Sequence, residues 1–384
     1  MRYELKEDTL ILFLEGELNS YNADGVEKEI DSTLKDKKFK GLILNLENLR
    51  YISSAGLRII LKLKQKYNDV VITDASLEVY DILQMTGFTN IMTVKKALKR
   101  VYIQGAEVIG EGFFSTVYRV DKDTIIKVFN RMSDADQIER ELKLAKEAFI
   151  LGIPTAISFD IVKVDEKLGV RFEMLDCMSL KTAVLTYPDK VKYYLSKYAE
   201  LLKKLNSTEC YNPIVPDIKK FFLEKVDTIK PYLEEKYYLK ARKLLESIED
   251  RKTFVHGDCH FKNIMVQKDD LILIDMDTLS VGHPIFELAT LYAPYCAFNE
   301  DEPDNSERFF GINAKDASAL YNALLNLYFG KDDPVIKDKI RLVAYIHMVW
   351  WTHTNTPDNK VRLEGCRGRL YKLLDQFDDL DIGL

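Results

Sequence analysis

Residues 254–277 read FVHGDCHFKNIMVQKDDLILIDMD, and this stretch determines the fold that we expect for most of the chain. A polar loop containing Asp258 and Asn263 follows one apolar segment, and Asp275 follows a second apolar run at 271–274. Carboxylate and amide oxygens are the ligands that Mg²⁺ prefers, and a further carboxylate can orient a reacting hydroxyl. The alternative is a polar hairpin between two buried strands whose acids only cap turns. Such a hairpin has no reason to reproduce the whole pattern.

The spacing within the loop is typical of phosphoryl transfer. Asp258 and Asn263 are five positions apart, as in the protein-kinase signature H-R-D-L-x-x-x-N, and His256 precedes the Asp by two residues. The wording HGDCHFKN departs from protein kinases and resembles the HGDxHxxN loop of the aminoglycoside phosphotransferase and choline kinase superfamily. Neither a Lys two residues after the Asp nor a downstream A-P-E is present. The matching positions are Asp258, His260, Asn263, Asp275 and Asp277.

This resemblance implies a two-lobed kinase-like fold of the α+β class. It also implies that Asp258 is catalytic and that Asn263 and Asp275 bind Mg²⁺ beside ATP. The segment GHPIFELATL (282–291) resembles the helix start that follows the metal-binding Asp in that superfamily. Glu287 stands where the family usually has Asp, and we expect this departure to change a structural contact but not the chemistry.

Composition limits the kinds of protein that this chain can be. It has 384 residues, of which 47% are hydrophobic and 30% charged, enough for more than one folded core. A net charge of -6 argues against broad binding to nucleic acid or anionic membranes. The five cysteines form no CxxC pair, and the N-terminus lacks a basic segment followed by a long apolar core. We therefore expect a cytoplasmic multidomain protein with no nucleic-acid or membrane partner.

Residues 1–100 have a pattern of their own. An alternating strand pattern is followed by a helical stretch at 23–34 and by the buried strand GLILNL at 41–46. The segment NLENLRYISSAGLRIILKL (45–63) and the later TGF turn (86–88) resemble the STAS domain of anti-sigma-factor antagonists. The resemblance implies an α/β domain that covers residues 1–100 and interacts with a protein partner.

Two serines precede the amphipathic helix of this domain, and Ser53 or Ser54 can supply its N-cap. In the STAS family this loop reads D-S-S/T-G, and its serine is phosphorylated by partner kinases. Aligned on Gly56, that serine is Ser54, whereas Ser53 replaces the Asp. A phosphate there would meet unpaired N–H groups at a helix start. Because Ser53 departs from the motif, the alternative that both serines only cap the helix remains open. The expected apolar face consists of Leu57, Ile60, Leu61 and Leu63.

Residues 101–384 continue without a Pro-, Gly- or Ser-rich linker, so we expect a short joint between the domains. We expect an N-terminal lobe at 101–176 and a C-terminal lobe at 177–384. The segment IGEGFFSTVYRV (109–120) matches the kinase Gly-rich loop G-x-G-x-x-G-x-V, with Ser in place of the third Gly. Taken alone, it is equally compatible with a plain glycine turn. The matching residues are Gly110, Gly112, Ser115 and Val117.

Lys127 lies in the apolar segment TIIKVF (124–129), like the Lys of V-A-I-K that pairs the phosphates of ATP. An unpaired ammonium would be costly in such a buried strand, so an anion is expected beside it. The next helix offers Glu139 and Glu141, which cannot both face the sheet. Because R-E-L resembles the kinase helix-C pattern, we predict that Glu141 is the partner.

Residues 169–180 run from a strand into a polar loop, as the hinge between kinase lobes does. Backbone groups of Glu173 and Leu175 would bind the adenine edge, and Phe172 would line the back of the pocket. An ordinary strand end is the alternative.

The acceptor pocket is expected among the helices that follow Asp277. If the acidic loop 299–305 lies near Asp258, it would favour a cationic acceptor such as an amino sugar or a choline-like amine. The alternative is a loop that is only solvated. The cluster of His347, Trp350, Trp351 and His353 is expected to pack rather than to bind a ligand.

These expectations converge on a phosphotransferase that uses Mg²⁺ and ATP to phosphorylate a hydroxyl of a small-molecule acceptor. The first alternative is a protein kinase that acts on Ser54, in cis or on another chain. The second is a nucleotide-sensing scaffold without catalysis.

Overall fold

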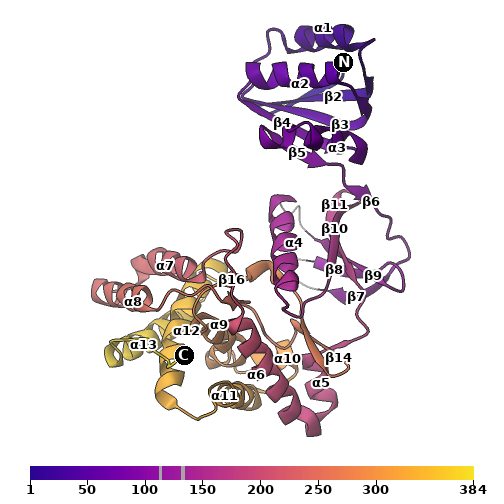
Figure 1. Cartoon of the computed structure of the whole chain (residues 1–384). Helices are drawn as coiled ribbons and strands as arrows, with labels where there is room; N and C mark the ends of the chain where they lie inside the picture. Colours follow the sequence, from indigo (N-terminus) through magenta and orange to yellow (C-terminus); the bar gives the residue numbers. More distant parts are fainter. Residues whose placement is uncertain (112–114, 131–134) are drawn as a thin grey trace. The chain divides into compact units, whose positions relative to one another are not determined.

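The chain folds into two compact units, which Figure 1 shows in a computed structural model. The structure describes residues 1–111, 115–130 and 135–384, with the side chains of 135 and 136 also left out. The first unit comprises Met1–Tyr102 with Val162–Asp165, and the second comprises Ile103–Ile161 with Glu166–Leu384. An α/β unit followed by a two-lobed α+β unit is the architecture that the sequence predicts.

The first unit contains a five-stranded sheet with the strand order β1-β2-β3-β4-β5. Strand β1 pairs antiparallel with β2, whereas the pairs β2-β3, β3-β4 and β4-β5 are parallel. Its elements are β1 (Tyr3–Lys6), β2 (Thr9–Leu18), α1 (Ala23–Leu34), β3 (Gly41–Ile52), α2 (Ser54–Lys66), β4 (Asp69–Ala75), α3 (Leu77–Met85), the 3₁₀ helix η1 (Phe88–Asn90), β5 (Thr93–Lys96) and β6 (Lys99–Arg100).

Alternating apolar residues place one face of this sheet in the core. Leu12 pairs with Leu44, which in turn pairs with Ile72, and all three are buried. Helices α1, α2 and α3 contribute side chains to the same core. The apolar face predicted for α2 is partly wrong, because Ile59 is buried whereas Leu61 is 36% exposed. Buried positions 56, 59, 60 and 63 follow the helical repeat, which leaves Leu61 on the flank.

The N-terminal lobe of the second unit is built on a sheet with the order β10-β11-β9-β8-β7, beside which Figure 1 draws α4. The short strand β6 pairs in parallel with Val162 and Lys163 of β10, which fall in the first unit. The elements are β7 (Glu107–Glu111), β8 (Ser115–Arg119), β9 (Thr124–Phe129), α4 (Ala135–Ile150), β10 (Ser158–Val164) and β11 (Lys167–Glu173).

The C-terminal lobe is mostly helical and encloses the largest apolar core, in which Phe222, Phe286 and Tyr345 are fully buried. Two small sheets, β12-β14-β15 and β13-β16, carry the loop quoted above. The elements are β12 (Met178–Ser179), α5 (Leu180–Thr186), η2 (Pro188–Lys190), α6 (Val191–Ser207), α7 (Ile218–Ile229), η3 (Lys230–Tyr232), α8 (Glu235–Ser247), β13 (Phe254–Val255), β14 (Ile264–Gln267), β15 (Asp270–Leu273), η4 (Met276–Thr278), β16 (Ser280–Val281), α9 (Ile285–Tyr295), η5 (Ala297–Glu300), α10 (Asn305–Phe310), α11 (Ala314–Phe329), α12 (Pro334–Asn355) and α13 (Lys360–Gln376).

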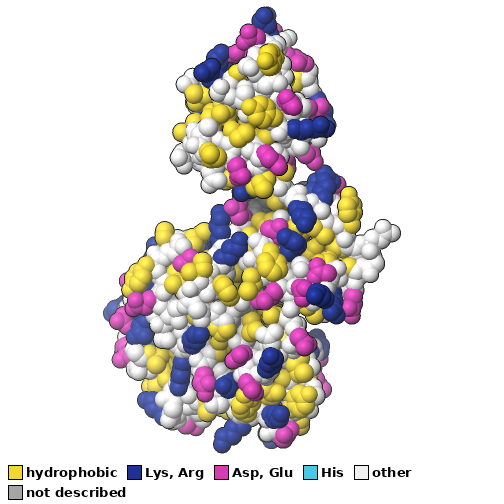
Figure 2. Space-filling view, turned by 45° about the vertical axis from the view of Figure 1, so that its right-hand side comes forward, with side chains coloured by type: hydrophobic (Ala, Val, Ile, Leu, Met, Phe, Trp, Pro, Cys, Tyr) yellow, Lys and Arg dark blue, Asp and Glu magenta, His cyan; other side chains and the backbone are white. Residues whose placement is uncertain are grey.

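Basic and acidic side chains are interspersed over the face drawn in Figure 2, as the small net charge of -6 leads one to expect. In the described parts of the chain, every helix is too short or too polar to cross a membrane.

Candidate active site

The loop between β13 and β14 holds Asp258 beside Asn263. The Asn263 side-chain nitrogen Nδ2 donates to the Asp258 backbone oxygen at 2.9 Å and to its carboxylate Oδ2 at 3.0 Å. These bonds fix the carboxylate on the loop. They also use the amide nitrogen, so the amide oxygen of Asn263 remains as the atom that can coordinate a cation.

His256 fixes the start of the loop from inside the protein. Its Nδ1 accepts a hydrogen bond from the Asp258 N–H at 3.3 Å, and its Nε2 lies 3.1 Å from the Ile274 carbonyl oxygen. Burial lowers the pKa of His256, so the ring is neutral and Nε2 carries the proton. Gly257 adopts a φ of +82°, and a Cβ there would lie 3.2 Å from the Thr278 carbonyl oxygen. A neutral His and a Gly therefore shape the turn that presents Asp258.

Glu287, the departure from the family pattern, contacts the same loop. Its Oε2 accepts hydrogen bonds from the backbone N–H of His256 at 2.5 Å and of Gly257 at 3.4 Å. Burial raises the pKa of Glu287 to about 7, although these bonds oppose the rise. Glu287 thus ties the start of α9 to the backbone of the loop that carries Asp258.

Lys127 joins the two lobes at this site. Its Nζ lies 3.0 Å from Oε1 of Glu141 on α4 and 2.7 Å from Oδ1 of Asp275. Burial alone would lower the pKa of Lys127, but attraction to Asp275 and Glu141 outweighs it and the pKa is raised. Glu139 is instead half-exposed and pairs with Lys143 at 2.7 Å. Glu141 is therefore the acid that lies beside Lys127.

Three carboxylates crowd this region. Burial, reinforced by Asp275 and Asp277, raises the pKa of Asp258 to about 8. Burial and Asp275 likewise raise the pKa of Asp277 to about 7. Burial would also raise the pKa of Asp275, but Lys127 overrides it and the pKa is lowered. Ionising all three carboxylates together would therefore concentrate negative charge that Lys127 offsets only in part, and a cation bound beside them would relieve it.

Such a donor set fits a magnesium ion that binds together with a nucleotide. Within the described parts of the chain, no group of three or more His, Cys, Asp and Glu side chains could hold a metal ion alone. Mg²⁺ usually binds through one or two protein carboxylates together with phosphate oxygens. The amide oxygen of Asn263, the carboxylate of Asp275 and the excess charge around them meet that requirement.

The expected nucleotide-binding residues lie in the N-terminal lobe and the strand that leaves it. Strands β7 and β8 form an antiparallel hairpin in which Gly110 pairs with Val117, and Ser115 begins β8. Gly112 lies outside the described residues. Glu173 ends β11, and its backbone N–H donates to the Ile157 carbonyl at 3.0 Å. Only the backbone carbonyl of Glu173 is therefore left for the adenine contact predicted there. Leu175 lies in the loop that follows β11.

The acidic loop 299–305 is engaged within the protein. Nε of Arg362 lies 2.8 Å from Oδ2 of Asp301, and its NH2 group pairs with Glu302. Arg369 lies 3.0 Å from Glu300. The expectation that this loop recognises a cationic acceptor finds no support, because α13 already neutralises it. Neither is the loop merely solvated, since the Asp301 side chain is only 15% exposed.

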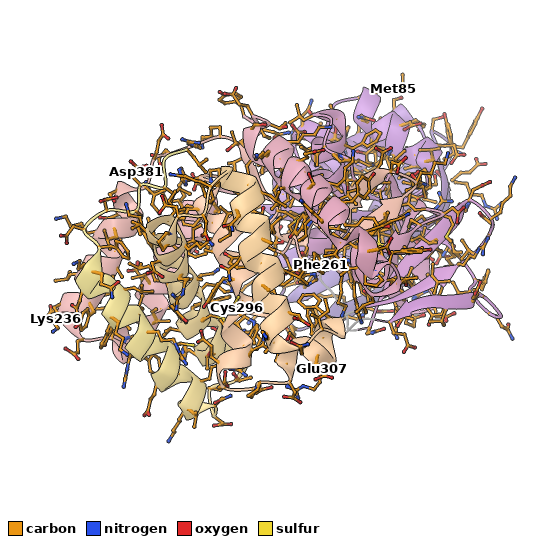
Figure 3. All side chains as sticks on the ribbon, turned by 90° about the horizontal axis from the view of Figure 1, so that it is seen from below. Met85, Lys236, Phe261, Cys296, Glu307 and Asp381 are labelled. Carbon is orange, nitrogen blue, oxygen red and sulfur yellow. The ribbon has the colours of Figure 1, made fainter. Side chains whose placement is uncertain are left out.

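Aromatic residues distant in sequence support the loop that carries Asp258. The Tyr198 hydroxyl donates to the Cys259 carbonyl, and the Tyr295 hydroxyl accepts from the Phe261 N–H at 3.1 Å. Phe261, labelled in Figure 3, is buried with its ring 5.2 Å from that of Tyr295 and 6.0 Å from that of Phe310. These contacts join residues that are far apart in the sequence and belong to no local motif, so they could not be predicted from the sequence alone.

Lys225 on α7 lies in the same lobe, within an aromatic enclosure. Its Nζ lies 2.8 Å from Nδ1 of His347 and 4.1 Å, 4.2 Å and 4.6 Å from the ring centres of Phe222, Phe221 and Trp350. The described residues provide no carboxylate partner, and burial lowers the pKa of Lys225 from 10.5 to about 7. His347 and Trp350 therefore pack around a buried amine.

This burial makes stability depend on pH. Below about pH 7 both folded and unfolded Lys225 are protonated, so the folded state bears the full desolvation cost. As pH rises toward 10.5, the folded amine is already neutral, so that cost falls. Between pH 6 and pH 9, the free energy of unfolding of wild type should therefore rise by about 2–3 kcal/mol relative to that of Lys225→Met. Urea unfolding at both pH values measures this, with exposed Lys220→Met as the control. A pH-independent difference would mean that Lys225 titrates normally.

Ser53, not Ser54, caps helix α2 in the first unit. Its hydroxyl oxygen accepts from the Ala55 N–H at 3.2 Å, whereas Ser54 is the first helical residue and is exposed. The Ser54 hydroxyl is therefore not needed as the cap.

We expect Ser53→Ala to cost about 0.5–2 kcal/mol of stability through loss of the cap. Ser54→Ala should cost much less, because it removes no capping bond. Urea unfolding of both variants provides the comparison. Equal losses would show that Ser54 shares the capping role.

Comparisons with known proteins agree with both parts of this description. A model described as the STAS domain matches residues 1–101, and one described as the phosphotransferase enzyme family matches residues 105–308. The protein BtrV of Bordetella bronchiseptica is 36% identical over 89 residues, which cover 22% of this chain and 76% of that protein. The anti-sigma F factor antagonist of Paenibacillus polymyxa is 30% identical over 89 residues, which again cover 22% of this chain and 76% of that protein.

Solved structures resemble the chain more distantly. A choline/ethanolamine kinase family protein from Mesorhizobium loti has 13% identity and a TM-score of 0.47, covering 70% of this chain and 88% of that one. A thermostable mutant of the aminoglycoside phosphotransferase APH(4)-Ia has 15% identity and a TM-score of 0.45, covering 71% and 94%. The family matches, rather than these likenesses, carry the assignment.

Proposed function

Because this chain belongs to the phosphotransferase enzyme family and carries a STAS domain, we propose that it transfers the γ-phosphate of ATP to a hydroxyl of a small-molecule acceptor. The observation that carries the proposal is the convergence on one site of Asp258, held by Asn263, and Lys127, paired with Glu141 and Asp275. Such a site needs little covalent chemistry, because positioning and charge compensation supply most of the catalysis.

Each residue has a defined role in the proposed reaction. Asp258 orients the acceptor hydroxyl and takes its proton as the hydroxyl oxygen bonds to phosphorus and the bond to ADP breaks. Lys127, held by Glu141, pairs with the nucleotide phosphates. Backbone groups of Gly110, Gly112, Ser115 and Val117 line the phosphates, and Glu173 and Leu175 contact adenine. These nucleotide contacts follow the kinase motifs that the sequence carries.

Asn263 and Asp275 are the residues that would hold Mg²⁺. The ion would neutralise charge on the nucleotide phosphates. Asp277 is the neighbouring acid that could share the task, since Asp275 strongly affects its pKa.

A screen for ADP release tests the proposal. The panel contains amines, sugars, nucleosides and simple polyols, including the amino sugars and choline-like amines that the family resemblance suggests. Acceptor-dependent ADP release that disappears in Asp258→Asn is expected. Nucleotide binding without release for any hydroxyl compound would favour a non-catalytic scaffold.

A protein-kinase activity toward Ser54 is the second candidate. The observation that favours it is the exposure of Ser54, whose hydroxyl is not used as the helix cap. Phosphate at a helix N-terminus would be stabilised by free N–H groups and by the helix dipole. Phosphoserine formed with ATP and Mg²⁺ alone would distinguish this activity from small-molecule transfer.

A further inference from the structure

His260 lies on the loop that carries Asp258, and the reaction proposed above gives it no role. Backbone bonds fix its place, since its N–H donates to the Asp258 carbonyl at 2.9 Å and its carbonyl accepts from the Asn263 N–H at 2.8 Å. Only 8% of the residue is exposed. The turn that presents Asp258 therefore also positions the imidazole ring.

Two phenylalanines hold this ring in place. Its centre lies 5.1 Å from the ring centre of Phe309 and 5.9 Å from that of Phe310, and both contacts are edge to face. Phe310 is fully buried and stacks on Tyr295 with the ring centres 4.8 Å apart, so the wall behind the imidazole is itself well packed. The imidazole therefore has little freedom to turn.

The two nitrogens of the ring have different surroundings. Nε2 lies 3.6 Å from Oδ1 of Asp258, whereas Asn263 donates to the other carboxylate oxygen, Oδ2. Nδ1 is buried and makes no hydrogen bond to any other described residue. An ionised carboxylate only accepts hydrogen bonds, so the ring proton belongs on Nε2, where it faces an acceptor.

The distance of 3.6 Å is longer than a hydrogen bond, which spans about 2.7–3.2 Å. Catalytic hydrogen bonds are often long in ligand-free proteins and shorten in the complex with substrate. A small rotation of Asp258 about its Cβ–Cγ bond would close the gap, and this torsion has broad energy minima. The Nε2–H is therefore placed to fix Oδ1 once the carboxylate turns toward an acceptor.

The unpartnered Nδ1 shows that packing alone does not explain a histidine at this position. A buried polar atom without a partner lowers stability, and an apolar side chain of similar size avoids that loss. Phe309 and Phe310 would pack against such a side chain equally well. What the imidazole adds here is an N–H that faces the carboxylate of Asp258.

Resting on the phosphotransferase activity proposed above, we propose that His260 is a positioning residue that holds Oδ1 of Asp258 through its Nε2–H, while Asn263 holds Oδ2. Two contacts fix the plane of the carboxylate, whereas Asn263 alone leaves it free to twist. The acceptor hydroxyl then meets an oxygen of fixed direction. Its proton passes to Asp258 as the new P–O bond forms and the bond to ADP breaks, and His260 neither gains nor loses a proton.

Two substitutions separate positioning from packing. His260→Gln keeps an N–H donor of comparable reach, and His260→Met fills the space without a donor. ADP release with Mg²⁺ and ATP is measured for the panel compounds and for water as the acceptor. His260→Met should lower kcat by roughly 10- to 100-fold with the KM for ATP unchanged, the scale expected when a reacting group is misplaced. His260→Gln should recover most of that rate.

Stability should not follow the rate. The urea midpoint of His260→Met should equal or exceed that of wild type, because the substitution removes the unpartnered nitrogen. His353→Met is the control, since its ring lies on α12 against Tyr232, and it should keep the wild-type rate. Parallel losses of rate and stability in His260→Met, without recovery in His260→Gln, would assign His260 to packing and overturn the inference.

A double variant tests whether His260 acts through Asp258. In the Asp258→Asn background, His260→Met should lower the single-turnover rate little further, because the carboxylate that it positions is gone. Effects that multiply would mean that His260 acts independently of Asp258, which would overturn the inference.

Histidine ¹⁵N NMR of the full chain with ADP and Mg²⁺ added provides a readout that needs no turnover. The signals of His260, identified by their absence in His260→Gln, should show the proton on Nε2 and should shift in Asp258→Asn. A proton on Nδ1 alone would overturn the inference. If wild type releases ADP and His260→Met matches its kcat, the inference fails while the proposed function stands. If wild type releases no ADP with any acceptor, the proposed function fails, and the NMR result decides the contact separately.

Discussion

Asp258→Asn is expected to lower kcat by about 10²- to 10⁴-fold, the usual contribution of a positioned acid-base group. The substitution removes the proton-accepting carboxylate but retains its shape. The new amide oxygen can still accept the bond that Nδ2 of Asn263 donates at 3.0 Å, so the loop should keep its conformation. Nucleotide affinity should remain nearly unchanged, because Asn263, Asp275 and Lys127 are intact.

The measurement pairs single-turnover rates with nucleotide titration. Asp270→Asn is a matched control, since Asp270 is exposed at the start of β15. It should keep the wild-type rate. A full rate in Asp258→Asn would remove Asp258 from the mechanism, and a large loss of nucleotide affinity would assign it to binding instead.

Asp275→Ala is expected to weaken Mg²⁺-dependent nucleotide binding most strongly. It removes an anionic oxygen that a hard cation needs and the partner that lies 2.7 Å from Nζ of Lys127. Loss of even an outer-shell partner typically costs about 10- to 100-fold in metal affinity, so the loss here should be at least that large. Nucleotide binding without Mg²⁺ should change much less.

A second substitution tests whether any loss in Asp275→Ala comes from backbone strain instead of from the missing carboxylate. Asp275 has a φ of 65°, a left-handed conformation that Asn tolerates better than Ala. Asp275→Asn should therefore keep the fold and still weaken the Mg²⁺-dependent part of binding. Titration of ATP with and without Mg²⁺ measures both variants. Unchanged affinity would transfer the metal-binding role to Asp277.

Local motifs explain why much of the fold and site could be predicted. The spacing of Asp258, Asn263 and Asp275 depends on one hairpin, and the burial of Lys127 follows from its apolar neighbours. The choice of Glu141 over Glu139 followed from the resemblance of R-E-L to the kinase helix-C pattern, and in the structure Glu141 lies beside Lys127 whereas Glu139 pairs with Lys143. Such features are encoded within a few residues of one another.

Features that depend on distant contacts could not be predicted. Arg362 pairs with Asp301 from 61 positions away, so the acidic loop is neutralised within the protein and is not free to bind a cationic acceptor. The Tyr198 hydroxyl supports Cys259 from another helix. The choice between Ser53 and Ser54 as the helix cap also required the backbone geometry, since both residues are serine and serine caps equally well at either position.

The most direct test of the proposed function is the destination of the γ-phosphate. Wild type is incubated with Mg²⁺, γ-labelled ATP and the acceptor panel, and label is followed in the protein and in the low-molecular-weight filtrate. The proposal predicts a new phosphate ester in the filtrate that requires both the acceptor and Asp258. Label confined to protein serine, or ADP formed without any phosphorylated acceptor, would contradict it.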